Sequence, residues 1–233
     1  MLFRSGQFYV WTVTNGVQTG GFNIGTIGVN WNILSTGDFN RDGNHDVLWR
    51  NNDDGHLYVW TFDAAGHQTG GSSLGVLGTN WTGAGVGDFN GDGTSDVLLR
   101  NADNGRLYVY TLNGGQLSGG YDLNTFGTDW VVGGVGDFNG DGISDIALKN
   151  NVSGQFYILQ SDTAGSYTGS NLGIIGTNFN IASVGDYNHD GVDDFLLRNS
   201  VTNQVTIMAM EDGHQAATGS GVIGAYASDL IIV

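Results

Sequence analysis

The sequence contains no cysteine, no proline and only seven lysine and arginine residues among 233. Without cysteine, the chain can form neither disulfides nor thiolate metal sites. The few basic residues stand against 23 acidic ones, for a net charge of −16. This balance argues against nucleic acid and anionic membranes as partners, because both require clustered cations. No apolar run approaches the ~18 residues that cross a bilayer, so we expect no membrane insertion.

Glycine, by contrast, accounts for 41 residues, more than twice its usual share. Helices tolerate so much glycine poorly. The chain also has 6 Trp, 9 Tyr and 11 Phe, too many for a disordered acidic protein. The composition therefore predicts a compact all-β fold. The N-terminus lacks the basic stretch and apolar segment of a secretory signal, so cellular location has to be inferred from the chemistry of the chain.

Three sequence patterns recur with a common period. The motif G-D-[FY]-N-x-D-G-x-x-D, followed by an apolar segment, occurs at intervals of 50, 49 and 49 residues, at 37–51, 87–101, 136–150 and 185–199. A glycine followed by an aromatic and apolar segment occurs at 6–11, 55–60, 105–110, 154–159 and, in weakened form, 203–208. A Gly-x-x-aromatic pattern begins at residues 28, 78, 127 and 176, and at 224 without its aromatic. Self-similarity of this kind indicates a repeat fold.

Each period reads as four short strands. In the second full copy these strands are expected at Trp81–Gly87, Val97–Arg100, Arg106–Leu112 and roughly Leu117–Phe126. Asn-Gly pairs at 104–105 and 113–114 are typical of hairpin turns. Four antiparallel strands in about 49 residues make one blade of a β-propeller. Residues 107–110 are apolar on both faces, as expected of a blade that two neighbours cover.

The repeat register predicts how the two ends of the chain fit together. Seven positions separate each strand-initial aromatic from the first loop Asp, and the fifth copy would reach that Asp one position beyond Val233. The first four residues align with 47–50. We therefore predict a single domain, 1–233, forming a five-bladed β-propeller whose fifth blade is closed by strands from both termini. An open piece of a larger propeller and a ring closed by a second copy are the alternatives.

The acidic residues concentrate in the repeated loop, and all but Glu211 are Asp. In D-x-N-x-D-G-x-x-D, side-chain oxygens occupy positions 1, 3, 5 and 9, and the backbone carbonyl of position 7 offers a fifth ligand. Such hard oxygens suit Ca²⁺, whereas Zn²⁺ or Cu²⁺ would favour His or Cys. Glycine at position 6 permits a sharp turn around the ion. We predict about four Ca²⁺ sites, with the ligands Asp38, Asn40, Asp42, Asn44 and Asp46; Asp88, Asn90, Asp92, Thr94 and Asp96; Asp137, Asn139, Asp141, Ile143 and Asp145; and Asp186, Asn188, Asp190, Val192 and Asp194.

Two other interpretations fit the loop less well than a calcium site. An EF-hand requires a bidentate Glu at position 12, where these loops carry Trp49, Leu99, Leu148 and Leu197. A single loop of this composition would be a solvated Asx turn. Four copies in register favour ion binding, because three carboxylates within nine residues repel one another unless a cation lies between them. We therefore expect the calcium-free protein to be loose or unfolded.

The loop and the L-L/W-R-N segment after it resemble the FG-GAP and VCBS repeats of bacterial surface proteins. These repeats are similar to the calcium-binding blades of integrin α-subunit propellers and of some fungal lectins. The resemblance covers the whole chain, and it implies that each loop joins the innermost strand of a blade to the second. It further implies calcium-dependent adhesion, glycan binding or a scaffolding role, extracellular or at the bacterial cell surface. Relatives commonly have seven blades, so a count of five departs from the family pattern.

Two repeated features outside the loops are candidate ligand-binding residues. One is a cation at a fixed repeat position and the other is the strand-initial aromatic; the residues are Arg4, Arg50, Arg100, Lys149 and Arg198, and Trp31, Trp81, Trp130 and Phe179. The cations would grip an acidic glycan, or else would satisfy carbonyls or an Asp of a neighbouring blade such as Asp53 or Asp103. The aromatic residues Trp11, Trp60 and Tyr110 fit a core between blades better than sugar stacking.

Nothing in the sequence indicates catalysis. No Ser, His and Asp grouping and no phosphate-binding glycine motif stands out. We predict a calcium-stabilised recognition module that is not an enzyme. A multivalent glycan-binding lectin or adhesin is the first hypothesis, with carbohydrate or a cell-surface protein as partner. A non-catalytic protein-binding or structural scaffold within a larger bacterial surface protein is the alternative.

Overall fold

The computed structural model describes residues 6–225, which form twenty β-strands. None of the described residues forms a helix that could span a membrane. Sheet 1 contains β1 (Gln7–Thr14) and β2 (Val17–Thr26). Sheet 2 contains β3 (Trp31–Gly37), β4 (Asp46–Asn51), β5 (His56–Phe62) and β6 (Gln68–Val76). Sheet 3 contains β7 (Trp81–Gly87), β8 (Asp96–Asn101), β9 (Arg106–Asn113) and β10 (Gln116–Thr125).

The last two sheets repeat the pattern. Sheet 4 contains β11 (Trp130–Gly136), β12 (Asp145–Asn150), β13 (Gln155–Ser161) and β14 (Tyr167–Ile174). Sheet 5 contains β15 (Phe179–Gly185), β16 (Asp194–Asn199), β17 (Gln204–Met208) and β20 (Gly221–Ala225). A small hairpin, β18 (Met210–Glu211) with β19 (His214–Gln215), lies between β17 and β20. Every pairing is antiparallel between neighbours in chain order, apart from the one that this hairpin interrupts.

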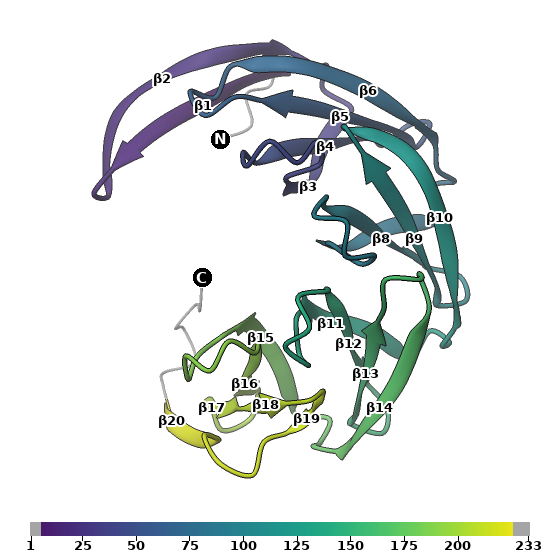
Figure 1. The fold of residues 1–233 in the computed structure, drawn as a ribbon, viewed down its shortest axis with the longest axis vertical. Helices are drawn as coiled ribbons and strands as arrows, with labels where there is room; N and C mark the ends of the chain where they lie inside the picture. The colour runs from purple at the N-terminus through teal and green to yellow at the C-terminus, as the bar shows by residue number, and fades with distance from the viewer. Residues whose placement is uncertain (1–5, 226–233) are drawn as a thin grey trace.

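The strands predicted for the second full copy are confirmed: β7 has the predicted bounds, and the bounds of β8, β9 and β10 differ from the predicted ones by at most one residue. The reason is that the apolar and turn-forming residues that defined them recur at each repeat. In every four-stranded sheet the first strand lies innermost, so that β3, β7, β11 and β15 are successive neighbours. The outer strands β2, β6, β10 and β14 follow the rim of the molecule (Figure 1). The acidic loops join the innermost strand to the second, as the resemblance implied.

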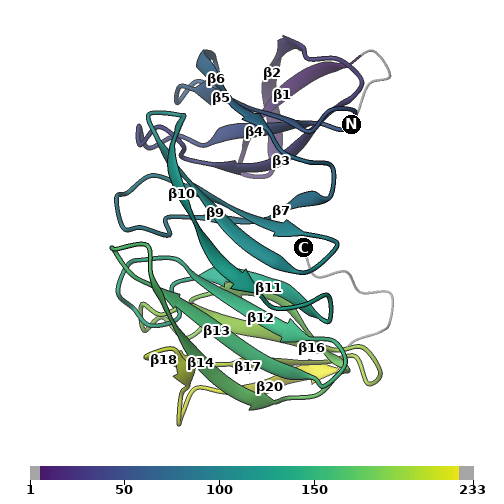
Figure 2. The ribbon, with the colours of Figure 1, turned by 90° about the vertical axis from the view of Figure 1, so that its right-hand side faces the viewer.

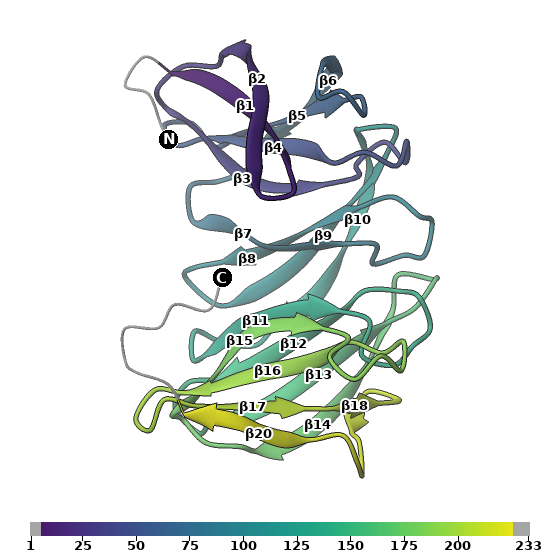
Figure 3. The same cartoon turned by 90° about the vertical axis from the view of Figure 1, so that its left-hand side faces the viewer.

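The sheets follow one another in an arc that is open between sheets 1 and 5 (Figure 1). Figures 2 and 3 show them from the sides as successive layers. Within residues 6–225 no strand pairing joins sheet 1 to sheet 5, and sheet 1 has only the two strands β1 and β2. The two strands predicted to close the fifth blade fall on residues 1–5 and 226–233, which lie outside the described residues. Closure and the count of five blades therefore stay predictions.

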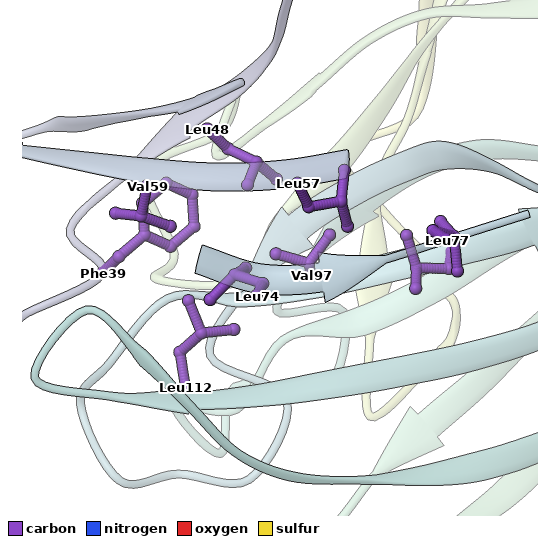
Figure 4. Close-up of a cluster of buried hydrophobic side chains, with 9 residues drawn as sticks. Phe39, Leu48, Leu57, Val59, Leu74, Leu77, Val97 and Leu112 are labelled. Atoms are coloured by element: carbon purple, nitrogen blue, oxygen red, sulfur yellow. The ribbon is translucent and has the colours of Figure 1, made fainter. Parts of the chain in front are cut away.

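Apolar side chains fill the spaces between consecutive sheets. One cluster joins sheets 2 and 3 and is drawn in Figure 4, where Phe39, Leu48 and Leu57 face Val97 and Leu112. A second cluster joins sheets 3 and 4, and a third joins sheets 4 and 5. Each inner sheet therefore buries both of its faces, which explains why its strands are not alternately apolar and polar.

Sheet 1 differs from the others because the described structure places a neighbour on one side of it only. Trp11 is 54% exposed, and Tyr9 and Val13 on the same strand are exposed as well. Trp60 and Tyr110, at the equivalent positions, are half-buried between sheets. The expected burial between blades is thus found for Trp60 and Tyr110, while Trp11 departs from it.

Candidate functional site

The four acidic loops share one hydrogen-bonded conformation. In each, the first Asp accepts the backbone N–H groups of positions 5 and 6, and the Asn at position 3 also accepts the N–H of position 5. The Asp at position 5 accepts the N–H of position 7 at 2.8 to 2.9 Å. Glycine at position 6 has a positive φ in all four loops, at 82° to 89°, which confirms the sharp turn expected there.

The Asp at position 9 has a different environment from the other three. It begins the second strand of each four-stranded sheet and is fully buried in all four repeats. In sheet 3, one carboxylate oxygen of Asp96 accepts the N–H of Phe89 at 3.2 Å, and the other accepts the N–H of Leu112 at 2.9 Å. The same two bonds occur at Asp46, Asp145 and Asp194. This residue therefore fastens the acidic loop to the end of the third strand.

Burial of this carboxylate also changes its acidity. Desolvation raises the pKa of Asp96 and of Asp145 to about 7, and the neighbouring loop carboxylates add to that rise. Burial raises the pKa of Asp46 and Asp194 in the same direction. Each loop thus holds a buried carboxylate near two others, with no basic side chain in an ion pair with it among the described residues.

The loops are linked to one another from sheet to sheet. The N–H at position 8 of one loop donates to the carbonyl of the first Asp of the preceding loop, at 2.8 Å in all three cases: Ser95 to Asp38, Ser144 to Asp88, and Asp193 to Asp137. Asp193 also accepts the N–H of Asp137 through its carboxylate. A backbone movement in one loop would therefore alter the hydrogen bond that connects it to the loop of the next sheet.

The loops suit calcium in the chemistry of their donors. Each supplies hard carboxylate and amide oxygens, and a carboxylate that accepts two hydrogen bonds still has free lone pairs. Within the described residues, however, no group of three or more Asp, Glu, His or Cys side chains converges in the manner of metal ligands. The carboxylates at positions 1 and 5 turn toward the backbone of their own loop, and the one at position 9 turns toward the strand.

The repeated cations lie at the junctions between sheets. Arg50 donates to the carbonyl of Gly78, and Arg100 donates to the carbonyls of Thr128 and Trp130. Lys149 donates to the Thr177 carbonyl and to the Asn180 side chain. These contacts agree with the second interpretation of the cations, in which they donate hydrogen bonds to backbone carbonyls and do not grip a glycan.

The cation set has two further members. Arg198 contacts Asn203 within its own sheet, and Arg4 lies outside the described residues. The carboxylates of Asp53 and Asp103 accept hydrogen bonds from the side-chain amides of Asn30 and Asn80, respectively. No hydrogen bond from a repeated cation to either carboxylate is found among the described residues.

The strand-initial aromatics Trp31, Trp81, Trp130 and Phe179 are half-buried. They begin β3, β7, β11 and β15, whose other ends carry the acidic loops. A seven-residue strand spans about 20 Å, so the aromatic residues and the loops occupy opposite faces of the molecule. Two of the four line pockets between sheets.

The two pockets occupy the same position in successive repeats. The pocket between sheets 2 and 3 has a volume of about 270 Å³ and is lined by Leu77, Trp81, Leu99, Arg106, Tyr108 and Tyr110. The pocket between sheets 3 and 4 has a volume of about 340 Å³ and is lined by Asn124, Phe126, Trp130, Gln155, Tyr157, Leu159, Tyr167 and Gly169. Trp130 and Tyr157 meet edge to face, with ring centroids 6.3 Å apart. Each pocket thus combines a tryptophan, at least two tyrosines and a polar side chain that can donate hydrogen bonds.

Several pocket residues escaped the sequence analysis. Tyr108 and Tyr157 follow the repeated glycine at a constant distance, which is a signal in the sequence, but for residues 107–110 this pattern predicts a strand covered by neighbouring blades. Arg106 and Gln155 occupy one repeat position with different side chains. Arg106 forms an ion pair with Asp122 at 2.8 Å, and Gln155 donates to Asn171 at 3.0 Å.

Comparisons with known proteins agree with the fold. Residues 38–99 and 88–148 match the model of FG-GAP-like repeats. The chain is similar to the solved Dos1 propeller, with 13% identity and a TM-score of 0.52 over 90% of this chain and 52% of that one. It thus spans about half the length of that propeller. It also matches part of a Photorhabdus luminescens Tc holotoxin pore, with 14% identity, a TM-score of 0.36, and coverage of 84% of this chain and 12% of that one. No curated protein sequence gives a significant match.

These findings show an all-β propeller whose middle part consists of FG-GAP-like repeats. Propellers with such repeats are a fold of protein-binding modules and are generally not catalytic. A fold does not by itself determine the ligand, which has to be argued from the site.

Proposed function

We propose that this propeller of FG-GAP-like repeats is a calcium-stabilised, extracellular recognition module that binds carbohydrate in the pockets between its sheets. The observation that carries the proposal is the repetition of one aromatic pocket at two successive sheet junctions. A repeated pocket supports multivalent binding, because several weak sites on one molecule gain avidity on a dense surface.

The chemistry of the pockets suits a sugar. Half-buried Trp and Tyr side chains present apolar ring faces against which the C–H face of a pyranose can lie, and their polar edges form hydrogen bonds. In the pocket between sheets 3 and 4, Asn124 already donates to the hydroxyl of Tyr167 at 2.8 Å. Gln155 adds a second amide beside Trp130. Apolar walls with a few polar groups are typical of small-ligand sites.

Calcium would act on the opposite face, where it stabilises the fold. The residues proposed to hold it are those at positions 1, 3, 5 and 9 of each loop together with the carbonyl at position 7. Binding would require the side chains at positions 1 and 5 to exchange hydrogen bonds with their own backbone for bonds to the ion. The ion would supply the positive charge that the buried carboxylates lack. Weak acidic loops of this kind fill at millimolar calcium, which favours an extracellular or bacterial cell-surface location.

A glycan array tests the proposal. We expect sugar binding in the presence of calcium, and loss of binding with a chelator as the propeller loosens. Trp130→Ala should remove one pocket and weaken binding to the array, whereas Trp11→Ala removes an exposed tryptophan outside both pockets and should leave sugar binding unchanged. An array without hits in calcium, on protein that remains folded, would refute carbohydrate binding.

One observation favours a second candidate, a protein-binding scaffold. The exposed aromatic and aliphatic residues Tyr9, Trp11 and Val13 form an apolar surface on sheet 1, and surfaces of this kind mark contacts between proteins. In a scaffold, Trp11→Ala would abolish partner binding and Trp130→Ala would not. The same two variants therefore separate the two candidates.

A further inference from the structure

A third pocket lies near the first one, at the same junction between sheets 2 and 3. It has a volume of about 390 Å³, and its lining comes from β3, from the end of β4 and from the start of β7; the polar and aromatic residues are Asn32, Arg50, Asn52, Thr79, Trp81 and Thr82. Trp81 lines both this pocket and the aromatic pocket between the same sheets. The two pockets are thus adjacent parts of one junction.

Arg50 has an unsatisfied charge in this pocket. Arg50 is 9% exposed, and its Nη2 donates to the carbonyl of Gly78 at 3.2 Å. Nη1 is buried and has no hydrogen-bond partner. Arg50 forms no ion pair within the described residues, and burial lowers the pKa of its guanidinium. A buried cation without a counter-ion is costly, so an anion at this position would be bound favourably.

The equivalent cations of the next two sheets also form no ion pair within the described residues, but they have more hydrogen-bond acceptors than Arg50. Arg100 donates to two backbone carbonyls, and Lys149 donates to a carbonyl and to the oxygen of Asn180. In sheet 3 the counterpart of Asn180 is Thr82, which bonds instead to the carbonyl of Arg100. Arg50 therefore lacks the second acceptor that the neighbouring sheet supplies at the later junctions.

The surroundings narrow the chemical class of the anion. A guanidinium matches the two oxygens of a carboxylate, while the amides of Asn32 and Asn52 and the hydroxyl of Thr79 suit the hydroxyl groups of a sugar ring. The net charge of −16 opposes ligands that carry several negative charges. We infer that this pocket binds the carboxylate of a uronic acid, as part of a glycan whose neighbouring sugar occupies the aromatic pocket beside Trp81. This inference rests on the proposed function and adds an acidic sugar to it.

Isothermal titration with two matched ligands tests the inference. One is an oligosaccharide that contains glucuronic acid, and the other is the same oligosaccharide with its carboxyl group reduced to the neutral alcohol. We expect wild-type protein in calcium to prefer the acidic form by at least about tenfold, which corresponds to one charge-assisted hydrogen bond. Arg50→Gln should remove this preference, and Arg50→Lys should keep only part of it. Arg41→Gln makes the same change of charge in an exposed acidic loop and should leave the preference intact.

The outcomes distinguish the inference from the proposed function. Equal binding of the acidic and neutral forms by the wild type overturns the inference and leaves carbohydrate binding standing. Binding of neither form, together with a glycan array that has no hits in calcium, overturns the proposed function. In that case a titration of the wild type with free glucuronate, followed by the ¹⁵N resonances of the Arg50 side chain, decides the inference alone. A saturable shift supports an anion site, and no shift overturns it. The same titration serves if thermal melting shows that Arg50→Gln does not fold.

Discussion

Replacing Gly105 by Ala should disrupt the contact between the β8–β9 turn and residues 126–127. Because Phe126 belongs to the pocket between sheets 3 and 4, this pocket should be disrupted as well. Gly105 lies in the turn between β8 and β9 with a φ of +74°. Its N–H donates to Asn101 at 2.9 Å, and its carbonyl accepts the N–H of Phe126 at 3.3 Å. A Cβ atom at Gly105 would overlap the carbonyl of Gly127, closer than any real Cβ contact. Phe126 lines the pocket, so the displacement would reach the proposed sugar site.

The size of the effect follows from two costs. A left-handed conformation costs about 1–2 kcal/mol for a residue with a Cβ, and the forced movement of the neighbouring backbone adds about 1–3 kcal/mol. We therefore expect Gly105→Ala to lower the free energy of unfolding by about 2–5 kcal/mol. Gly114→Ala is the matched control, because Gly114 also has a positive φ, at +57°, but no atom lies within 4 Å of its added Cβ. Gly114→Ala should therefore lower the free energy of unfolding only by the cost of the left-handed conformation, about 1–2 kcal/mol.

Urea unfolding of the two variants in calcium measures this difference, and titration with an array-positive sugar measures the effect on the pocket. Gly105→Ala should weaken sugar binding, while Gly114→Ala should not. Equal loss of stability in both variants would show that the turn does not press against Gly127 as described. A Gly105→Ala protein with unchanged sugar affinity would separate the pocket from this turn.

Two further predictions concern the acidic loops. Asp141→Ala removes a loop carboxylate, and should abolish the stabilisation of one site by calcium, about 2.7 kcal/mol at a concentration 100 times the dissociation constant. Asp54→Ala removes an exposed carboxylate that also accepts a backbone N–H, from His56, and should leave the calcium effect intact in the same melting experiment. Without calcium, the raised pKa values of Asp96 and Asp145 mean that the folded state holds protons that the unfolded state releases. In a chelator, whatever protein stays folded should therefore be most stable near pH 4, and its free energy of unfolding should fall as pH rises to about 7. The double variant Asp96→Asn, Asp145→Asn should show a smaller slope in urea unfolding, and an unchanged slope would contradict the buried state of these carboxylates.

Most of the strand positions could be predicted from the sequence because the information for them is local. The repeated motif fixes where the loop turns, and the apolar segment after it fixes the second strand. In sheet 3, the predicted start of β7 at Trp81 and that of β9 at Arg106 agree with the structure. The closure of the ring depends on pairing between the two ends of the chain, which no local pattern determines.

The roles of single residues were harder to predict from the sequence, because these roles depend on contacts between sheets. Position 9 of the loop has the composition of a metal ligand, yet Asp96 binds two backbone N–H groups that lie far apart in the sequence. The repeated arginines are alike in sequence, but Arg50 and Arg100 meet different acceptors. The pattern around Tyr108 and Tyr157 predicts apolar packing, whereas the structure shows that these rings line pockets. A repeat pattern identifies equivalent positions, and only the junction with the next sheet determines what each position does.

The separation of the two faces makes the two proposals, calcium in the loops and an acidic sugar in the pockets, compatible in one acidic molecule. The loops and the pockets lie at opposite ends of seven-residue strands, about 20 Å apart. At physiological ionic strength the Debye length is about 8 Å, so the field of the loops is largely screened before it reaches the pockets. Bound calcium would lower the charge of the loops further. Arg50 is shielded from solvent, and its attraction for a carboxylate is screened much less than the distant repulsion. For a ligand with a single carboxylate, the attraction of Arg50 should therefore outweigh the screened repulsion of the loops.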